Sequence, residues 1–228
     1  VRPVARRAPR TTGRTLAAIG ADVRDGRRDG VGGQVEAVES ARGSYVAVQG
    51  PPGTGKTYVG SRAVKELLDR GWTVGVTAQS HAVVENFLDQ LIGVGVDPDR
   101  VGKEPKDPDG PHRWTSLGSS EVHAFLAPGR VLGGTAWTFA NAAAQPVDLL
   151  VVDEAGQLSL AHLLGASALA ETVLLLGDPQ QLPQVSRGEH PQPIGDAALT
   201  WIAEGAPVLR PDRGFFLDTS WRMHSALT

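Results

Sequence analysis

Short apolar runs alternate along this chain with longer stretches in which apolar residues recur at helical spacing. The runs predict buried strands at residues 44–49, 73–78, 130–134, 147–152 and 172–176. The longer stretches predict helices at residues 34–41, 57–70, 82–92, 157–169 and 196–204. Apolar strands that alternate with helices are typical of an α/β fold, in which helices cover both faces of a parallel sheet.

Three segments depart from this alternation. Residues 1–33 are rich in Gly, Arg and Pro, and we expect a linker or the end of an upstream domain there. Their arginines indicate either a solvated linker or a basic arm that touches nucleic-acid phosphates. Residues 93–128 predict an irregular insertion, and residues 215–219 begin another strand.

Composition narrows the class of protein. The chain has 228 residues, of which 41% are hydrophobic and 21% charged, as expected for a soluble globular protein. No apolar run approaches the roughly 20 residues of a membrane span. Cysteine is absent, so disulfides and thiolate metal sites are excluded and we expect a cytoplasmic protein. Because the net charge is -3, contact with nucleic acid requires a local patch.

A phosphate-binding loop stands between the first predicted strand and the next helix. Its eight residues match the pattern G-x-x-x-x-G-K-[ST] in full: Gly50, Pro51, Pro52, Gly53, Thr54, Gly55, Lys56 and Thr57. Such a loop aims backbone N–H groups and a helix N-terminus at phosphate oxygens. We expect Lys56 to reach the β- and γ-phosphates and Thr57 to hold Mg²⁺.

Two further polar groups follow predicted strands. Asp153 and Glu154 end the strand at 147–152, where Asp153 is suited to bind Mg²⁺ and Glu154 to polarise the attacking water. Gln181 lies in the loop after the strand at 172–176, where an amide can sense a γ-phosphate without ionising. The carboxyl ends of parallel strands share one edge of the sheet, so these side chains should meet the phosphate loop.

In this order the motifs resemble superfamily 1 helicases, which are AAA-type P-loop ATPases, and most closely the branch of the nonsense-mediated-decay helicase. The resemblance rests on residues 33–38, 50–57, 77–86, 133–135, 153–157, 177–183 and 220–224. It implies a RecA-like fold that binds ATP and Mg²⁺, with Gln34 reading adenine. It also implies that Gln181 and Arg222 act on the γ-phosphate.

The same resemblance implies contacts to single-stranded nucleic acid from Ser80, His81 and Thr135, with DNA favoured over RNA. It assigns residues 34–214 to a first RecA-like motor domain and 215–228 to the start of a truncated second one. We expect this stretch alone to bind ATP, to hydrolyse it poorly and not to unwind duplexes. A RecB-like nuclease precedes such a helicase in similar bacterial proteins.

Other functions stay open on the sequence. A nucleotide-gated binding or regulatory module would keep the loop without strand separation, and a kinase or another P-loop ATPase would need no nucleic acid. Trp72, Trp137 and Trp201 are expected in the core, although base stacking by Trp137 is an alternative. Residues 112–114 are expected in an exposed loop.

Overall fold

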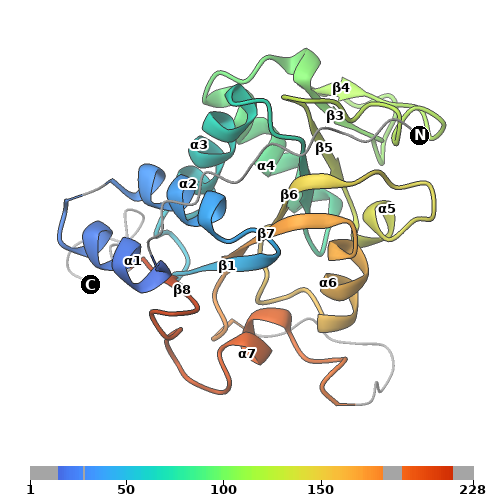
Figure 1. Ribbon diagram of the computed structural model, residues 1–228. Helices are drawn as coiled ribbons and strands as arrows, with labels where there is room; N and C mark the ends of the chain where they lie inside the picture. Colours follow the sequence, from blue (N-terminus) through green and yellow to red (C-terminus); the bar gives the residue numbers. More distant parts are fainter. Residues whose placement is uncertain (1–14, 28, 182–191, 218–228) are drawn as a thin grey trace.

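One sheet of eight strands forms the centre of the structure (Figure 1). The computed structural model describes residues 15–27, 29–181 and 192–217. The strands stand in the order β4-β3-β5-β2-β6-β7-β1-β8, and all pairings between them are parallel. The predicted α/β fold is therefore confirmed.

The strands are short, as is usual in α/β proteins. They are β1 (Ser44–Gln49), β2 (Val74–Thr77), β3 (Val101–Lys103), β4 (Thr115–Ser116), β5 (Val131–Gly134), β6 (Val147–Val152), β7 (Ala170–Gly177) and β8 (Gly214–Phe216). β1 and β6 have the predicted bounds, and β2, β5 and β7 lie within two residues of theirs.

Two helices precede β1, and most of the others lie between consecutive strands. They are α1 (Leu16–Arg24), α2 (Gly30–Ser40), α3 (Lys56–Asp69), α4 (His81–Gly93), the 3₁₀ helix η1 (Pro98–Arg100), α5 (Ala136–Phe139), α6 (Leu160–Ser167) and α7 (Ala198–Ile202). α2 begins four residues earlier than predicted because Asp29 caps it, its carboxylate accepting from the Gly32 N–H at 2.7 Å. α6 begins three residues later than predicted because turns follow β6.

The first described residues differ from the linker expected there. Residues 16–24 form α1, whose Ile19 is completely buried in the hydrophobic core. Gly20 of the same helix lies against the ring of Phe215, where a Cβ would come within 3.1 Å of the ring. The helix is short and only moderately amphipathic, so the Gly- and Arg-rich sequence concealed it. The division of the chain into domains stays a prediction.

Residues 93–128 were expected to be an irregular insertion, but they extend the sheet. β3 pairs with β5, placing Val101 beside Val131, and β4 pairs with β3. The strands are too short to give a periodic signal. Gly102 sits in β3 because a side chain there would collide with the ring of Phe125.

The end of the described chain also joins this sheet. β8 pairs with β1, setting Gly214 beside Ala47 and Phe216 beside Gln49. A Cβ on Gly214 would overlap the Ala47 carbonyl, so the close pairing needs glycine there. Residues 215 and 216, where we expect a second domain to begin, therefore belong to the same sheet as β1.

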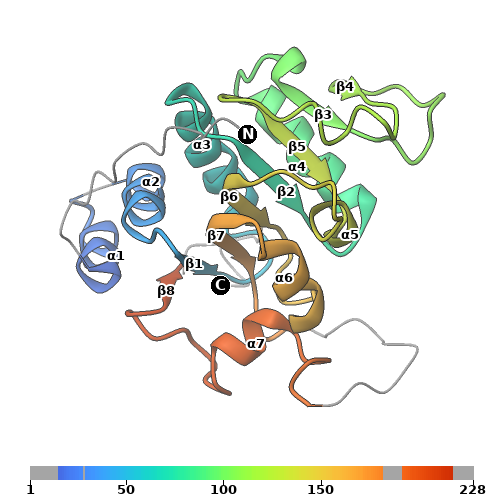
Figure 2. The ribbon, with the colours of Figure 1, turned by 45° about the vertical axis from the view of Figure 1, so that its right-hand side comes forward.

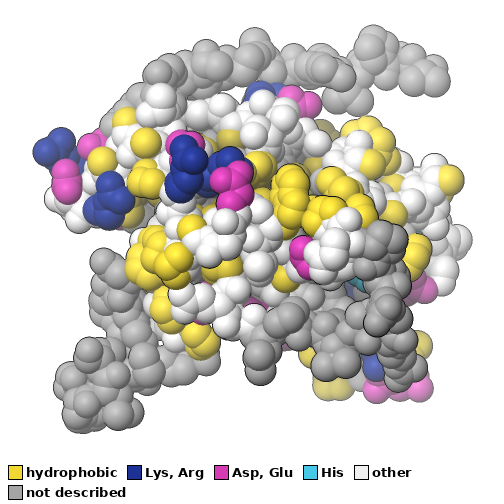
Figure 3. Space-filling view, turned by 90° about the horizontal axis from the view of Figure 1, so that it is seen from below, with side chains coloured by type: hydrophobic (Ala, Val, Ile, Leu, Met, Phe, Trp, Pro, Cys, Tyr) yellow, Lys and Arg dark blue, Asp and Glu magenta, His cyan; other side chains and the backbone are white. Residues whose placement is uncertain are grey.

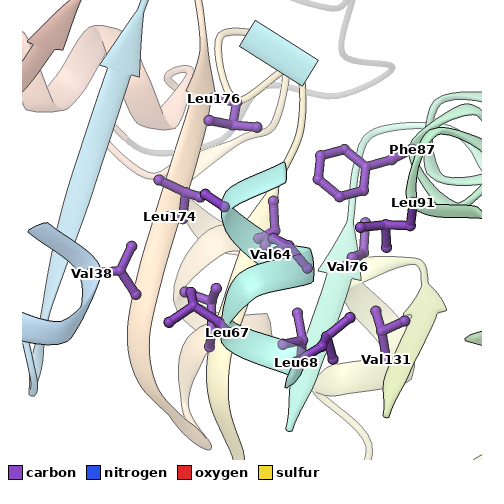
Figure 4. Close-up of a cluster of buried hydrophobic side chains, with 14 of the residues drawn as sticks. Val38, Val64, Leu67, Leu68, Val76, Phe87, Leu91, Val131, Leu174 and Leu176 are labelled. Atoms are coloured by element: carbon purple, nitrogen blue, oxygen red, sulfur yellow. The ribbon is translucent and has the colours of Figure 1, made fainter. Parts of the chain in front are cut away.

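Alternate residues of the central strands face two separate hydrophobic cores. One core lies beneath α1, α2, α3 and α4, and the other beneath α5, α6 and α7 (Figure 2). In β7, Leu174 and Leu176 face the first core while Leu175 faces the second. Figure 4 shows the first core, with Val64, Leu67 and Leu68 of α3 projecting among these labelled neighbours: Val38, Val76, Phe87, Leu91, Val131, Leu174 and Leu176.

Charges on the surface are interspersed. On the face drawn in Figure 3, Lys and Arg side chains lie next to Asp and Glu side chains. Arg70 pairs with Glu39 at 2.6 Å, and Lys65 pairs with Asp69 at 2.6 Å. Within the described ranges, none of the helices combines the length and the apolar character that crossing a bilayer requires.

A buried glutamine fastens the end of β1 to a segment far along the chain. Gln49 is 2% exposed, and its amide group donates to the Pro207 carbonyl at 2.7 Å. Its amide oxygen accepts from the Leu209 N–H, also at 2.7 Å. Since Gln49 directly precedes the phosphate loop, this clamp holds one end of the loop in place.

We expect Gln49→Leu to lower the free energy of unfolding by about 1–3 kcal/mol, because it leaves the buried N–H of Leu209 without its partner and removes one of two hydrogen bonds that the Pro207 carbonyl accepts. Urea denaturation followed by circular dichroism measures the change. Gln90→Leu is the matched control, since Gln90 is exposed on α4. Equal effects of the two changes would show that the clamp contributes nothing.

Candidate functional site

The phosphate loop, residues 50–55, curves between β1 and α3. Gly53 and Gly55 have φ values of 86° and 80°, in the left-handed region that glycine adopts without strain. A Cβ on Gly50 would collide with the Thr54 hydroxyl. The Gly50 N–H donates to the Gly177 carbonyl at 3.1 Å, which ties the loop to the end of β7.

The lysine of the loop is buried inside its curve. Lys56 is 7% exposed, and its ammonium donates to the carbonyls of Gly50 at 2.6 Å and Pro51 at 3.1 Å. α3 begins at Lys56 after Gly55, which offers no side-chain cap. The first N–H groups of α3 and the ammonium therefore combine into a site that suits an anion.

The acidic pair follows β6, two places along the sheet from β1. Asp153 is 2% exposed and accepts a hydrogen bond from the Thr57 hydroxyl at 3.3 Å. Its other oxygen accepts from the Glu154 N–H at 3.0 Å. Parallel pairing of β6 with β7, and of β7 with β1, thus brings residues 96 positions apart into contact.

Burial raises the pKa of Asp153 to about 6, and the neighbouring charge of Glu154 adds to the rise. The Glu154 N–H, the Thr57 hydroxyl and the Lys56 charge act in the opposite direction. A cation beside Asp153 would offset the cost of burying the charged carboxylate, because a nearby positive charge favours the ionised form.

Glu154 has an unusual backbone. Its φ of 54° lies in the left-handed region, which costs a residue with a side chain about 1–3 kcal/mol. Its Oε2 is buried, and no described residue supplies a hydrogen-bond partner. Such strain is common at functional sites.

The oxygens of Thr57 and Asp153 are hard donors of the kind that Mg²⁺ prefers. Across the described segments, His, Asp and Glu side chains form no group of three or more that could hold a metal. Mg²⁺ usually completes its shell with waters and substrate phosphates, so these two donors beside a phosphate loop fit that ion.

The turn after β6 packs directly on the end of β7. The Ala155 N–H donates to the Leu176 carbonyl at 2.8 Å. A Cβ on Gly156 would overlap the Asp178 carbonyl, and one on Gly177 would crowd the Gly156 N–H. This close approach explains why glycines occupy both positions, and it joins the acidic turn to the loop that carries Gln181.

Gln181 is linked to the acidic turn through a neighbour. The Gln157 amide donates weakly to Gln181 Oε1, at 3.5 Å. Gln34 lies on α2, which packs against α3. It is 3% exposed, and its Oε1 has no hydrogen-bond partner among the described residues. Arg222 lies outside the described residues.

The residues expected to contact nucleic acid lie at the same edge of the sheet, over β2 and β5. These strands pair so that Thr77 stands beside Gly134, and therefore Ser80 and Thr135 follow neighbouring strand ends. Ser80 caps α4, its hydroxyl accepting from the Val83 N–H at 3.3 Å. His81 is the first residue of that helix and is half-buried.

Two of the three tryptophans that we predicted to lie in the core are exposed. Trp72 is buried as predicted, but Trp137 is 73% exposed and Trp201 is 49% exposed. Trp137 follows Thr135 closely, and its ring meets His162 edge-on, with the ring centroids 5.8 Å apart. An apolar neighbourhood in sequence could not distinguish these environments, because α5 is only one turn long.

The loop expected at residues 112–114 is present and exposes Arg113, but Trp114 is buried. Trp114 is 5% exposed and stacks on His112 with centroids 4.3 Å apart. Beside it lies Lys103, which is 1% exposed. Nothing in the sequence pattern indicated a buried lysine, because its partners come from separate segments.

The comparisons with known proteins agree with this geometry. A family model described as "AAA domain" matches residues 31–204. The chain belongs to the AAA domain family. The predicted P-loop fold is thereby confirmed at the level of the family.

Curated relatives of this AAA domain carry helicase names. "DNA replication ATP-dependent helicase/nuclease JHS1" of Arabidopsis thaliana is 28% identical over 149 residues, which are 61% of this chain and 11% of the relative. "DNA replication ATP-dependent helicase/nuclease DNA2" of Homo sapiens is 27% identical over 165 residues, which are 66% of this chain and 15% of the relative. The chain thus spans a small part of these relatives.

Solved structures share the fold. The helicase nonstructural protein 10 of an arterivirus is 19% identical, with a TM-score of 0.51 over 80% of this chain and 37% of that one. The UvsW helicase of bacteriophage T4 is 12% identical, with a TM-score of 0.50 over 84% and 60% of the respective chains. The predicted RecA-like α/β architecture is confirmed by these neighbours.

We expect Gly156→Ala to disturb the acidic turn, because the added methyl group would overlap the Asp178 carbonyl. The unfolding free energy should fall by about 1–3 kcal/mol. Binding of Mg²⁺ and a fluorescent ATP analogue should also weaken. Thermal unfolding and a nucleotide titration measure the two effects.

Gly165→Ala is the matched control. A Cβ there would meet Ala140 at an ordinary 3.5 Å, and alanine favours the helix. Unchanged nucleotide binding in Gly156→Ala would contradict the importance of this close approach.

Proposed function

We propose that this AAA domain is the ATP-hydrolysing motor of a nucleic-acid helicase or translocase. The contact between the Thr57 hydroxyl and the Asp153 carboxylate, at 3.3 Å, is the main support. It joins the residue after the loop lysine to the acidic turn, the two positions that a metal-bound triphosphate needs together.

Each residue of this junction has a proposed task. Lys56 and the N–H groups of α3 bind the β- and γ-phosphates. Thr57 and Asp153 hold Mg²⁺, which offsets phosphate charge and orients the transferred group. Glu154 orients the attacking water, and its buried Oε2 without a described partner suits that task.

Three residues complete the nucleotide site in this proposal. Gln34 reads the adenine base, for which its buried amide oxygen without a described partner is suited. Gln181 relays the state of the γ-phosphate through the loop after β7. Arg222, in the proposed start of a second motor domain, reaches the γ-phosphate.

We propose that single-stranded nucleic acid crosses the strand ends of β2 and β5. Ser80, His81 and Thr135 contact its phosphates, and Trp137 offers an exposed face for a base. DNA is favoured over RNA, because the curated relatives are named for DNA replication. We also propose a nuclease domain elsewhere in the parent protein, since the same relatives are named helicase/nuclease.

We expect Lys56→Ala to reduce ATP turnover about 100-fold or more, because the ammonium that stabilises the transferring phosphate is lost. ATP hydrolysis with and without a single-stranded oligonucleotide is the measurement. Lys65→Ala is the matched control, since Lys65 lies on the same helix and pairs with the exposed carboxylate of Asp69 near the end of that helix.

The same assay separates the alternatives. Turnover that single strands stimulate supports the motor. Binding of Mg²⁺ and ATP that changes affinity for single strands, without turnover in any longer version of the protein, would favour a nucleotide-gated module. Turnover indifferent to nucleic acid would contradict both.

We expect Trp137→Ala to weaken single-strand binding by about 1–3 kcal/mol, because a stacked base loses its aromatic platform. Fluorescence anisotropy of a labelled oligonucleotide measures it. Trp201→Ala is the control, because this exposed tryptophan lies on α7, which α6 separates from α5 (Figure 2). Equal losses in both variants would count against stacking on Trp137.

A further inference from the structure

A buried ammonium lies under the histidine at the start of α4. Lys103 ends β3 and is 1% exposed. Its Nζ is 3.1 Å from His81 Nδ1, 3.0 Å from a Glu85 carboxylate oxygen and 2.8 Å from the Glu104 carbonyl. The Trp114 ring lies 5.4 Å from the same atom.

The donors and acceptors around Lys103 determine which ring nitrogen of His81 carries the proton. An ammonium carries three N–H donors and no acceptor, and here it faces three acceptors. His81 Nδ1 must therefore accept, since a proton on it would point at the ammonium. The neutral ring then carries its proton on Nε2, the nitrogen on the other side of the ring.

Burial and two nearby lysines also favour the neutral ring. The pKa of His81 is lowered, chiefly by burial and then by the charge of Lys103, with a smaller contribution from Lys106. Glu85 and Glu104 oppose this change. These charged groups come from α4, from β3 and from the segment after β3.

We propose that Lys103 is a positioning residue that fixes the ring of His81 with Nε2–H outward, as a neutral donor to a phosphate oxygen of single-stranded nucleic acid. The inference rests on the proposed function, because it assumes that the strand crosses the ends of β2 and β5. The buried lysine has no role in the nucleotide site. The proposal explains why a buried lysine ammonium lies beneath His81 at this edge of the sheet.

A neutral donor suits a motor that must hold and release a strand repeatedly. A hydrogen bond from an uncharged ring displaces no counterion, so it adds little to the salt dependence of binding. It also keeps this contact constant across neutral pH, whereas an imidazolium would strengthen as the pH falls. Lys103 thus provides orientation without placing its own charge on the strand.

The first test observes the ring directly. In the whole chain labelled with ¹⁵N-histidine, we expect His81 to show the Nε2–H tautomer and to titrate below an exposed histidine. His81→Gln identifies its signals. Lys103→Met keeps the length of the side chain beside Trp114 and should raise the titration midpoint of His81. An Nδ1–H tautomer in the unaltered chain, or an unchanged midpoint in Lys103→Met, would overturn the inference.

The second test measures binding of a labelled single-stranded oligonucleotide between pH 8 and pH 6. At pH 8, Lys103→Met should bind severalfold to about tenfold more weakly, because the donor is no longer oriented. As the pH falls, that variant should regain affinity, and the regain should vanish when His81→Gln is added. A purely structural loss would give a parallel profile with no dependence on His81, and it would overturn the inference.

Lys106→Met is the matched control, since it removes an exposed positive charge near the ring without removing a hydrogen bond to it. It should leave the tautomer unchanged. If the chain binds the oligonucleotide while the His81 signals do not move, the inference fails and the proposed function stands. If no oligonucleotide binds to the unaltered chain, the proposed function itself fails.

Discussion

The parallel register of β6, β7 and β1 is the constraint on which the candidate site depends. These pairings bring the phosphate loop, the acidic turn and the loop that carries Gln181 to one edge of the sheet. The hydrogen bond from the Gly50 N–H to the Gly177 carbonyl extends the ladder one residue beyond the end of β1. A slip in that register would move the hydroxyl of Thr57 away from Asp153, and no local interaction could restore the contact.

Buried charged groups at this edge form hydrogen bonds within the protein that offset part of the cost of removing them from water. The Lys56 ammonium donates to carbonyls of its own loop, and the Asp153 carboxylate accepts from a hydroxyl and an N–H. The compensation of Asp153 is incomplete, as its raised pKa indicates. A buried carboxylate of this kind beside a phosphate loop is suited to bind a cation, because the ion supplies positive charge that the protein's own contacts do not provide.

The other half of the same edge uses a buried cation differently. Lys103 faces Glu85, Glu104 and His81, so its donors are all used within the protein. In our proposals the two buried lysines at this edge have different roles. Lys56 binds a phosphate of the nucleotide, whereas Lys103 orients the His81 ring, which contacts a phosphate of the strand.

The sequence alone determined the fold class and the candidate nucleotide residues, because a phosphate loop and apolar strands are local patterns. It could not determine which strands are neighbours, since β3 and β8 are three residues long and pair with distant segments. The exposure of Trp137 and the burial of Lys103 were likewise decided only by tertiary structure. Burial depends on what the rest of the chain places against a residue, and three separate segments surround that lysine.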